Sequence, residues 1–312
     1  MPIHDPNGFE HRLWEAVTGG RPRWPDGKRS AFLLTYDMDA DSSWISRGLD
    51  EPIARSGGQF EVNVGTPCVL ELMKWFGLKT TFFTPGWIAE QYPDMVEAVF
   101  RDGHEIGFHG YLHEPPTNLK EAEEIEIVRR GCAAIEKLIG KRPVGYRSPI
   151  WQFSPNTVRI LRDAGFRYTA DFMHTLLPTF NEVDGTAIDM VNLPGSWVLD
   201  DAVYFQFHIS ARVALRSAAD VLAIYKEEFR AVHASGGLFV LVMHPQLSGR
   251  PSRVLMLKEL MDHVTGFKDV WLPRPIDVVD FWRSENWPFA TPKPAFPAPA
   301  PEARAGRFAA AV

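Results

Sequence analysis

The sequence is poor in cysteine and has no excess of positive charge. Two cysteines occur in 312 residues, Cys68 and Cys132, and they form no CxxC pair. This usage predicts no disulfide framework and fits a reducing compartment. The 33 Lys and Arg residues are outnumbered by 39 Asp and Glu residues, which gives a net charge of −6. An acidic chain without a basic cluster is a poor candidate for binding nucleic acid or an anionic membrane.

Long apolar runs are also absent. The longest, from Gly236 to Met243, is far too short to span a bilayer. Residues 1–20 carry Asp5, Glu10 and Glu15 and no apolar stretch, so they do not resemble a signal peptide. We therefore expect a soluble, cytoplasmic protein. Hydrophobic residues make up 45% of the chain, enough for the core of one large α/β domain or two smaller ones.

Composition divides the chain into three parts. Residues 1–28 are rich in Pro, Gly and Trp and are predicted to be an irregular leader, and residues 291–312 are predicted to be a Pro- and Ala-rich tail. Between them, residues 29–290 are predicted to form a single domain. Two stretches in it lack clear periodicity, so residues 42–63 are predicted to be a long connection and residues 171–210 to be less regular.

Strand and helix patterns alternate through the remainder of this domain. The runs at residues 31–36, 80–83, 105–108, 144–146, 166–170 and 238–243 are predicted strands, and amphipathic helical patterns lie between them. Such alternation favours a parallel sheet with crossover helices, either a barrel or a doubly wound sheet.

Two histidines, His109 and His113, are separated by four positions. On a helical turn, this spacing places both imidazoles on one face, close enough to bind one metal ion. Pro115 and Pro116 stop any helix directly afterwards. Because the chain has ten histidines, such a pair also arises by chance, so its context decides.

Three carboxylates follow the strand predicted at residues 31–36. Asp37, Asp39 and Asp41 form a costly cluster there unless a cation or a proton compensates them. Asp37 and Asp39 alternate and could point the same way. The alternative is a polar loop that caps the strand, but we favour a site.

Four candidate residues each lie just past the end of a different predicted strand: Asp37, His109, Arg147 and His244. In a β/α barrel those ends share one mouth, where catalytic residues gather, which favours the barrel over the doubly wound sheet. One carboxylate and two imidazoles provide three ligands for a divalent metal and leave a place for water. A second carboxylate can take the proton of that water, and an opposite imidazole can protonate a leaving nitrogen. Together, these side chains supply every group needed to hydrolyse an amide.

The order of these motifs resembles the polysaccharide deacetylase superfamily (NodB homology, carbohydrate esterase family 4) over roughly residues 25–285. The motifs are Tyr-Asp-x-Asp, His-x-x-x-His, Arg-Ser-Pro-x-Trp and His-Pro, which begin at Tyr36, His109, Arg147 and His244. The resemblance implies a distorted (β/α) barrel and makes residues 29–290 its catalytic domain. It also implies a hydrolase of non-peptide C–N bonds.

The resemblance implies a role for each motif residue. Asp39, His109 and His113 would be the metal ligands. Asp37 would be the catalytic base, and His244 the general acid.

Other residues would support this machinery. Arg147 would orient the base, and one member of the pair Asp200–Asp201 would orient the acid. Trp151 would form an apolar wall, and the backbone N–H of Ile150 would help bind the oxyanion.

The first motif departs from the pattern of sugar deacetylases, in which two acids are adjacent and a glycine follows. The spaced acids Asp37 and Asp39 resemble instead the cytosolic branch of peptidoglycan deacetylase-like proteins, cyclic imide hydrolases and metal-independent allantoinases. The base and ligand assignments of these two residues therefore stay open, and Asp41 could replace either. That all three ligands are present argues against the metal-free members.

From this resemblance we expect one divalent metal, with zinc first and cobalt or nickel as alternatives. The expected substrate is an N-acetyl sugar or a small cyclic imide or amide. The branch also implies a homo-oligomer, either a dimer or a tetramer. The alternatives are a non-catalytic carbohydrate-binding relic and a metal-independent allantoinase-like enzyme. A relic is expected to lose a ligand, the base or the acid, and none is missing.

Overall fold

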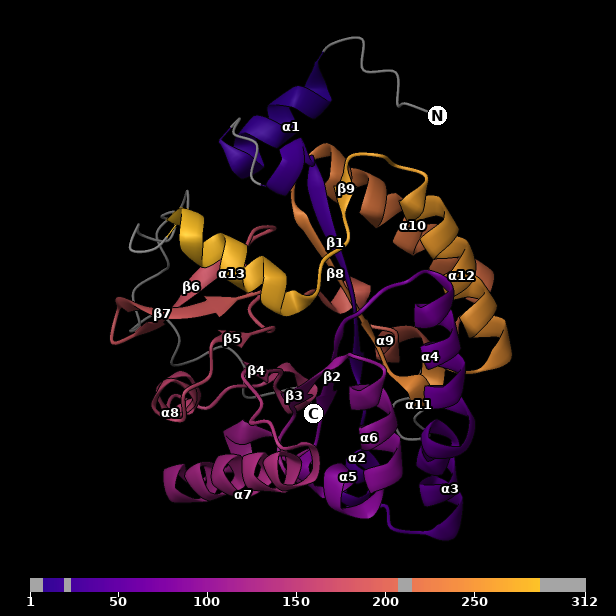
Figure 1. Cartoon of the computed structure of the whole chain (residues 1–312), viewed down its shortest axis with the longest axis vertical. Coiled ribbons are helices and arrows are strands. Elements are labelled where there is room, and N and C mark those ends of the chain that lie inside the picture. The colour runs from indigo at the N-terminus through magenta and orange to yellow at the C-terminus, as the bar shows by residue number, and fades with distance from the viewer. Residues whose placement is uncertain (1–7, 20–23, 207–214, 287–312) are drawn as a thin grey trace, which may run out of the picture.

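The protein is built around one nine-stranded sheet, seen in a computed structural model that describes residues 8–19, 24–206 and 215–286. The strands are β1 (Ser30–Asp37), β2 (Thr81–Thr84), β3 (Glu105–Phe108), β4 (Gly145–Tyr146), β5 (Tyr168–Thr169), β6 (Thr179–Val183), β7 (Thr186–Asn192), β8 (Leu238–Met243) and β9 (Val270–Trp271). Helices surround the sheet, so the fold is mixed α/β (Figure 1).

The helices connect the strands and cover the sheet. They are α1 (Phe9–Thr18), α2 (Ser42–Ile45), α3 (Pro52–Phe60), α4 (Thr66–Trp75), α5 (Gly86–Gln91), α6 (Pro93–Arg101), α7 (Glu121–Ile139), α8 (Thr157–Asp163), α9 (Ala202–Phe205), α10 (Ala218–Ala234), α11 (Pro245–Ser248), α12 (Pro251–Thr265) and α13 (Pro275–Asn286). A π-helical segment, η2 (Glu61–Gly65), joins α3 to α4. Short 3₁₀ turns occur at Pro25–Gly27, Pro116–Asn118, Pro149–Trp151 and Trp197–Leu199. None of the helices in the described part of the chain combines the length and the apolarity needed to cross a membrane.

The strand order is β6-β7-β5-β4-β3-β2-β1-β8, and β9 pairs with the start of β1. The pairings are parallel, apart from the antiparallel hairpin of β6 and β7. Within the described residues no ladder joins β8 to β6, but the N–H of Leu238 donates to the carbonyl of Leu176, just ahead of β6, at 2.8 Å. The predicted α/β fold, a distorted (β/α) barrel, is confirmed.

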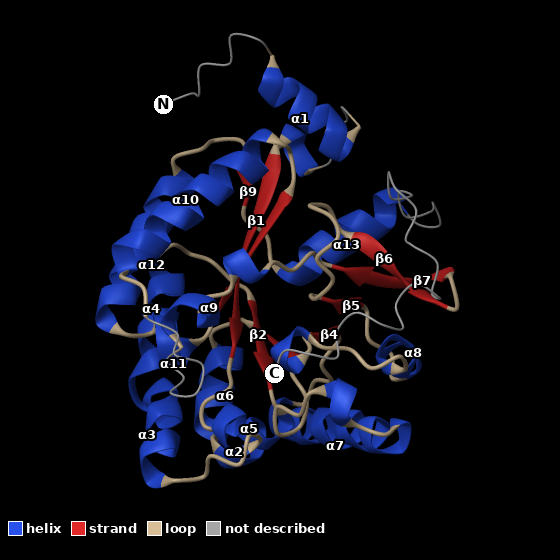
Figure 2. Ribbon diagram, turned by 180° about the vertical axis from the view of Figure 1, so that it is seen from behind, coloured by secondary structure: helices blue, strands red, loops and turns tan. Residues whose placement is uncertain are grey.

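Strand β1 lies between β2 and β8 and is buried along its whole length. Parallel strands covered on both faces need such apolar runs. Phe32 and Tyr36 belong to the outer core, which α4, α10 and α12 cover along one side of β1 and β8 (Figures 1 and 2). Ala31 and Leu33 belong to the inner core, which α13 closes. Because side chains alternate along a strand, Asp37 continues this inner row at the C-terminal edge of the sheet.

Two predictions of irregular structure are wrong. Residues 42–63 contain α2, α3 and most of η2 instead of a long connection. Pro52 occupies the first turn of α3, as proline favours. Gly57 and Gly58, which are poor helix formers, hide the helix in the sequence.

The stretch from 171 to 210 holds the β6–β7 hairpin. Its turn residues Asp184 and Gly185 both have positive φ, 51° and 74°. An Asp-Gly turn of this kind is a strong hairpin signal that the prediction passed over.

The N-terminal leader is not wholly irregular either. Helix α1 occupies Phe9–Thr18 and ends at Gly19 in the left-handed conformation, as glycine favours. The predicted tail at residues 291–312 lies outside the described residues. The domain boundaries stay predictions.

Candidate metal and acid–base site

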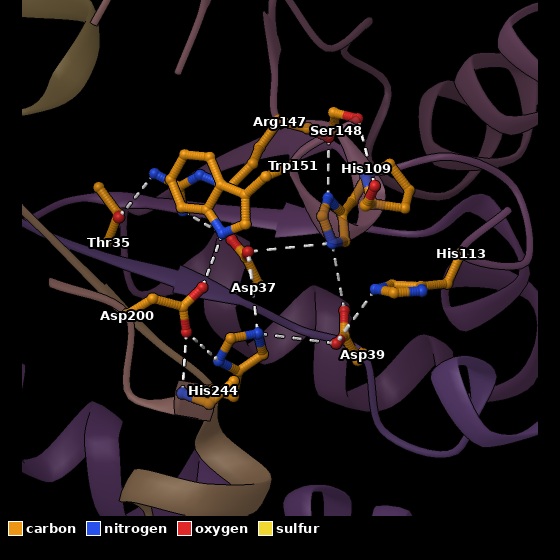
Figure 3. Close-up of polar contacts among 12 residues, drawn as sticks. Thr35, Asp37, Asp39, His109, His113, Arg147, Ser148, Trp151, Asp200 and His244 are labelled. Atoms are coloured by element: carbon orange, nitrogen blue, oxygen red, sulfur yellow. Dashed lines mark hydrogen bonds and ion pairs between the residues drawn. The ribbon is translucent and has the colours of Figure 1, made fainter. Parts of the chain in front are cut away.

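The ends of four parallel strands bring the candidate residues together (Figure 3). Asp37 ends β1, His109 follows β3, Arg147 follows β4 and His244 follows β8. Asp37, His109 and His244 line one cavity of about 100 Å³, together with Asp39. This is the shared mouth that the sequence predicted for the C-terminal edge of the sheet.

Asp39, His109 and His113 form a buried group whose potential ligand atoms all lie within 4.8 Å of one another. His109 Nε2 is 3.5 Å from Asp39 Oδ1, and His113 Nε2 is 3.5 Å from Asp39 Oδ2. His109 Nδ1 donates to the carbonyl of Arg147 at 2.8 Å, which leaves Nε2 free to act as a ligand. Within the described residues Asp39 Oδ1 has no hydrogen-bond partner.

These residues fit a divalent cation. A buried carboxylate oxygen without a partner is costly, and a cation removes that cost. Burial lowers the pKa of His113 to about 4, although the charge of Asp39 opposes the change, so the imidazole is neutral at neutral pH. Burial acts to raise the pKa of Asp39, but His113 and His109 outweigh it and leave that pKa below its usual value. A neutral imidazole and an ionised carboxylate are the states that bind metal.

The two histidines lie on a short turn that is not helical. Gly110 and His113 have φ of 74° and 61°, so the backbone turns through left-handed conformations. The backbone N–H groups of Tyr111 and Leu112 donate to Glu114 Oε2 at 3.0 and 2.8 Å and hold this turn. The imidazole centroids are nevertheless 5.0 Å apart. The left-handed turn therefore achieves the proximity that the helical spacing was expected to provide.

Asp37 has one oxygen bound and the other facing the cavity. Its Oδ1 accepts from Arg147 Nη1 at 2.6 Å, and Oδ2 is 3.9 Å from the Nε2 atoms of both His109 and His244. Arg147 has an exposed fraction of 0% and also donates to Thr35 Oγ1 at 3.0 Å. A fully buried guanidinium needs such a carboxylate partner, so the pair is fixed in position.

His244 is held by Asp201. Its Nδ1 is 2.6 Å from Asp201 Oδ1, and its backbone N–H donates to the same carboxylate at 3.1 and 3.2 Å. Ser248 Oγ also donates to Asp201. Burial acts to lower the pKa of His244, but the charge and hydrogen bond of Asp201 raise it well above its usual value. This shift favours the protonated imidazole, whose Nε2 faces Asp37 and Asp39.

Asp200 has a different partner. Its Oδ2 accepts from Trp151 Nε1 at 2.7 Å, whereas its Oδ1 is 3.8 Å from His244 Nδ1. Of the two adjacent acids, Asp201 is thus the one hydrogen-bonded to His244, and Asp200 orients the indole.

Ile150 and Trp151 line the same cavity on a 3₁₀ turn. Both have positive φ, 56° and 54°, an uncommon conformation for bulky residues that clusters at functional sites. The ring of Trp197 lies 5.8 Å from that of Trp151, so the two indoles form one apolar wall.

The third acid of the first motif points elsewhere. Asp41 accepts from Arg55 Nε at 3.0 Å and from the hydroxyl of Tyr92 at 3.0 Å. With both oxygens bound, Asp41 does not take the place of Asp37 or Asp39.

Sequence reasoning missed two buried acids behind the site. Asp171 accepts the backbone N–H of Ser148 at 2.8 Å, and burial raises its pKa to about 7. It directly follows a predicted strand, so the strand-end pattern could have found it. Glu61 accepts the backbone N–H of Ala40 at 3.0 Å, and no local sequence pattern singles it out.

Known proteins are similar to this chain in sequence and fold. The polysaccharide deacetylase family model matches residues 29–169. A peptidoglycan deacetylase from Helicobacter pylori is 29% identical over 269 residues, which cover 77% of this chain and 92% of that protein. The crystal structure of a "putative polysaccharide deacetylase" from Mycobacterium smegmatis superposes with a TM-score of 0.80 at 34% identity, covering 84% of this chain and 93% of that one. The structure of Puue allantoinase has the same fold, with a TM-score of 0.75 at 22% identity over 86% of this chain and 96% of its own.

Proposed function

Because the chain belongs to the polysaccharide deacetylase family, we propose that it is a metal-dependent hydrolase of non-peptide C–N bonds. The observation that carries the proposal is that a carboxylate, an imidazole and a group of three possible metal ligands line one cavity. Asp37 Oδ2 and His244 Nε2 are 3.9 Å apart, beside the group of Asp39, His109 and His113.

In this proposal Asp39, His109 and His113 hold one divalent cation, for which zinc, cobalt and nickel are candidates. When bound, the cation acts as a Lewis acid that polarises the substrate carbonyl and lowers the pKa of a water molecule.

Asp37 is proposed as the general base. Its Oδ1 is occupied by Arg147, so Oδ2 is the atom that takes the proton from the attacking water. The guanidinium fixes the direction of this carboxylate through a charge-assisted hydrogen bond.

His244 is proposed as the general acid. Its Nε2 carries the proton that passes to the leaving nitrogen, while Asp201 holds Nδ1–H. Asp201 thereby stabilises the charged imidazolium before transfer. Trp151 supplies the wall against which the substrate lies, and the backbone N–H of Ile150 is proposed to bind the oxyanion.

The cavity supports a small substrate. Its volume of about 100 Å³ is below the several hundred Å³ usual for ligand sites, and two indoles border it. We therefore propose a small cyclic imide or amide as the preferred substrate. An N-acetyl sugar is the second candidate, supported by the similarity to the Helicobacter pylori peptidoglycan deacetylase.

The test combines metal analysis with a substrate panel. We expect about one divalent ion per chain and hydrolysis of at least one member of a panel of succinimide, hydantoin and N-acetylglucosamine oligomers. The double variant His109→Ala, His113→Ala should lose both the ion and the activity. Full metal occupancy in that variant, or no hydrolysis of any member by metal-loaded wild type, would overturn the proposal. A higher kcat/KM on an N-acetylglucosamine oligomer than on every imide would reverse the substrate ranking.

A further inference from the structure

The helix that runs from α3 through η2 to α4 carries a buried acid with no part in the chemistry above. Glu61 is the first residue of the π-helical segment, and its side chain has an exposed fraction of 0%. Burying a carboxyl group is costly unless it makes compensating hydrogen bonds. π-Helical turns are rare and are frequent at functional sites. The buried carboxyl group and the π-helical turn both indicate that Glu61 holds a neighbouring segment in place.

The same helix touches two loops of the site through glycines. A Cβ on Gly58 would lie 2.4 Å from the carbonyl oxygen of Ala40, next to Asp39. A Cβ on Gly65 would lie 2.2 Å from the carbonyl oxygen of Pro245, next to His244. Only glycine permits these approaches. The helix backbone therefore contacts the loop of a proposed metal ligand at one end and the turn of the proposed acid at the other.

Glu61 lies between those two glycines in sequence and reaches one of the loops directly. The backbone N–H of Ala40 donates to Glu61 Oε2 at 3.0 Å. Ala40 has φ of +42°, which is unfavourable for a residue with a Cβ. Such a conformation persists only when its surroundings hold it, and this hydrogen bond is one such restraint. Its other oxygen, Oε1, has no hydrogen-bond partner among the described residues.

We propose that Glu61 is a positioning residue that holds the Asp39 loop on the helix whose Gly65 packs against the His244 turn. This inference rests on the proposed function of the site. Glu61 acts through the backbone of Ala40, so it fixes the direction from which Asp39 approaches a cation. Groups that orient metal ligands tune the affinity of a site although they never touch the metal.

The experiment compares Glu61 with a second buried glutamate that serves another part of the fold. Glu124 on α7 is buried and accepts hydrogen bonds from Ser154 Oγ at 2.6 Å and from Thr157. Glu61→Ala, Glu61→Gln and Glu124→Ala are prepared metal-free and titrated with Zn²⁺ against a chelating dye. Melting temperature, kcat and KM are measured for each.

We expect Glu61→Ala to weaken Zn²⁺ binding by about 10-fold, the lower end of the cost of losing a hydrogen-bond partner of a ligand, because Glu61 acts through the backbone next to Asp39. Its kcat should fall more than its KM changes. Glu61→Gln keeps an oxygen that accepts from Ala40 and should recover most of the affinity. Glu124→Ala should lower the melting temperature but bind Zn²⁺ as the wild type does, since its partners lie away from the site.

Two outcomes separate this inference from the proposed function. Tight Zn²⁺ binding by both wild type and Glu61→Ala would overturn the inference alone and make Glu61 a packing residue. No Zn²⁺ binding by the wild type would overturn the proposed function, and the inference with it. If Glu61→Ala does not fold, Glu61→Asp takes its place against Glu124→Asp, because its carboxyl group is one methylene short of Ala40.

Discussion

Asp200 and Asp201 are adjacent and chemically identical, yet they contact different residues. Asp201 receives the ring and backbone N–H groups of His244, whereas Asp200 receives the indole N–H of Trp151. At the level of single residues, the direction of each carboxylate determines its role. Asp201 is the main cause of the raised pKa of His244, because its charge and hydrogen bond counteract the effect of burial.

We expect His244→Ala to keep its metal and to lose roughly 10²–10⁴-fold in rate, the usual contribution of a positioned proton donor. The loss should be greatest for substrates with poor leaving groups, because an activated leaving group needs little protonation. Metal content and kcat/KM on a pair of activated and unactivated amides provide the measurement. Loss of the metal, or equal slowing of both substrates, would make His244 a ligand or a packing residue.

Replacing Asp201 should move the alkaline limb of the pH profile. A general acid works while protonated, so activity is present below the pKa of His244 and lost above it. Asp201 raises that pKa, so Asp201→Asn should lower it and shift the alkaline limb of kcat/KM to lower pH. Asp200→Asn is the matched control and should shift the limb less, because Asp200 Oδ1 is 3.8 Å from the ring. An equal or larger shift in the control would contradict the assignment.

At the scale of elements, the strands were predictable and the curved connections were not. The apolar runs of β1, β3 and β8 mark buried strands, and their ends locate Asp37, His109 and His244. The approach of His113 depends on a left-handed turn held by Glu114, which spacing alone cannot reveal. Periodicity also fails at η2, because a π turn adds a residue and shifts the apolar face.

Glu61 was missed for a related reason. It is one of 39 acidic residues in the chain, and its neighbours in sequence carry no motif. Its contact with Ala40 exists only after α3 and η2 have packed against the loop that follows β1. Sequence patterns predict where strands and helices end. They do not predict a contact between two elements, because that contact depends on how the elements pack together.

The tight packing of this helix predicts opposite effects for two of its glycines. Gly65→Ala places a methyl group 2.2 Å from the carbonyl oxygen of Pro245 and should destabilise the protein by roughly 1–3 kcal/mol. Gly57→Ala meets nothing within 4 Å and should stabilise α3 by about 0.5–1 kcal/mol, because alanine is the better helix former. Urea unfolding of both variants measures the difference. Equal stability of the two would show that the helix and the His244 turn do not pack as closely as described.

At the scale of the whole molecule, the two ends of the barrel have different tasks. Its inner row along β1 is apolar at Ala31 and Leu33 and polar at Thr35 and Asp37. The apolar end belongs to the inner core that α13 closes, whereas the polar end carries the site. Stability at one end and chemistry at the other is the usual division in a barrel of parallel strands.

The proposed ligands come from two parts of the barrel, since Asp39 follows β1 and the histidines follow β3 with β2 between them. The group exists only in the folded chain, so a bound ion should stabilise folding by mass action, by about 2.7 kcal/mol at a free metal concentration 100 times its Kd. We expect a chelator to lower the melting temperature of the wild type. The same chelator should leave the melting temperature of the double variant His109→Ala, His113→Ala unchanged.

His104 is a buried histidine that accepts the N–H of Thr80 at 3.2 Å, so His104→Ala should be less stable but still respond to the chelator. A chelator response that persists in the double variant would place the ion at other residues.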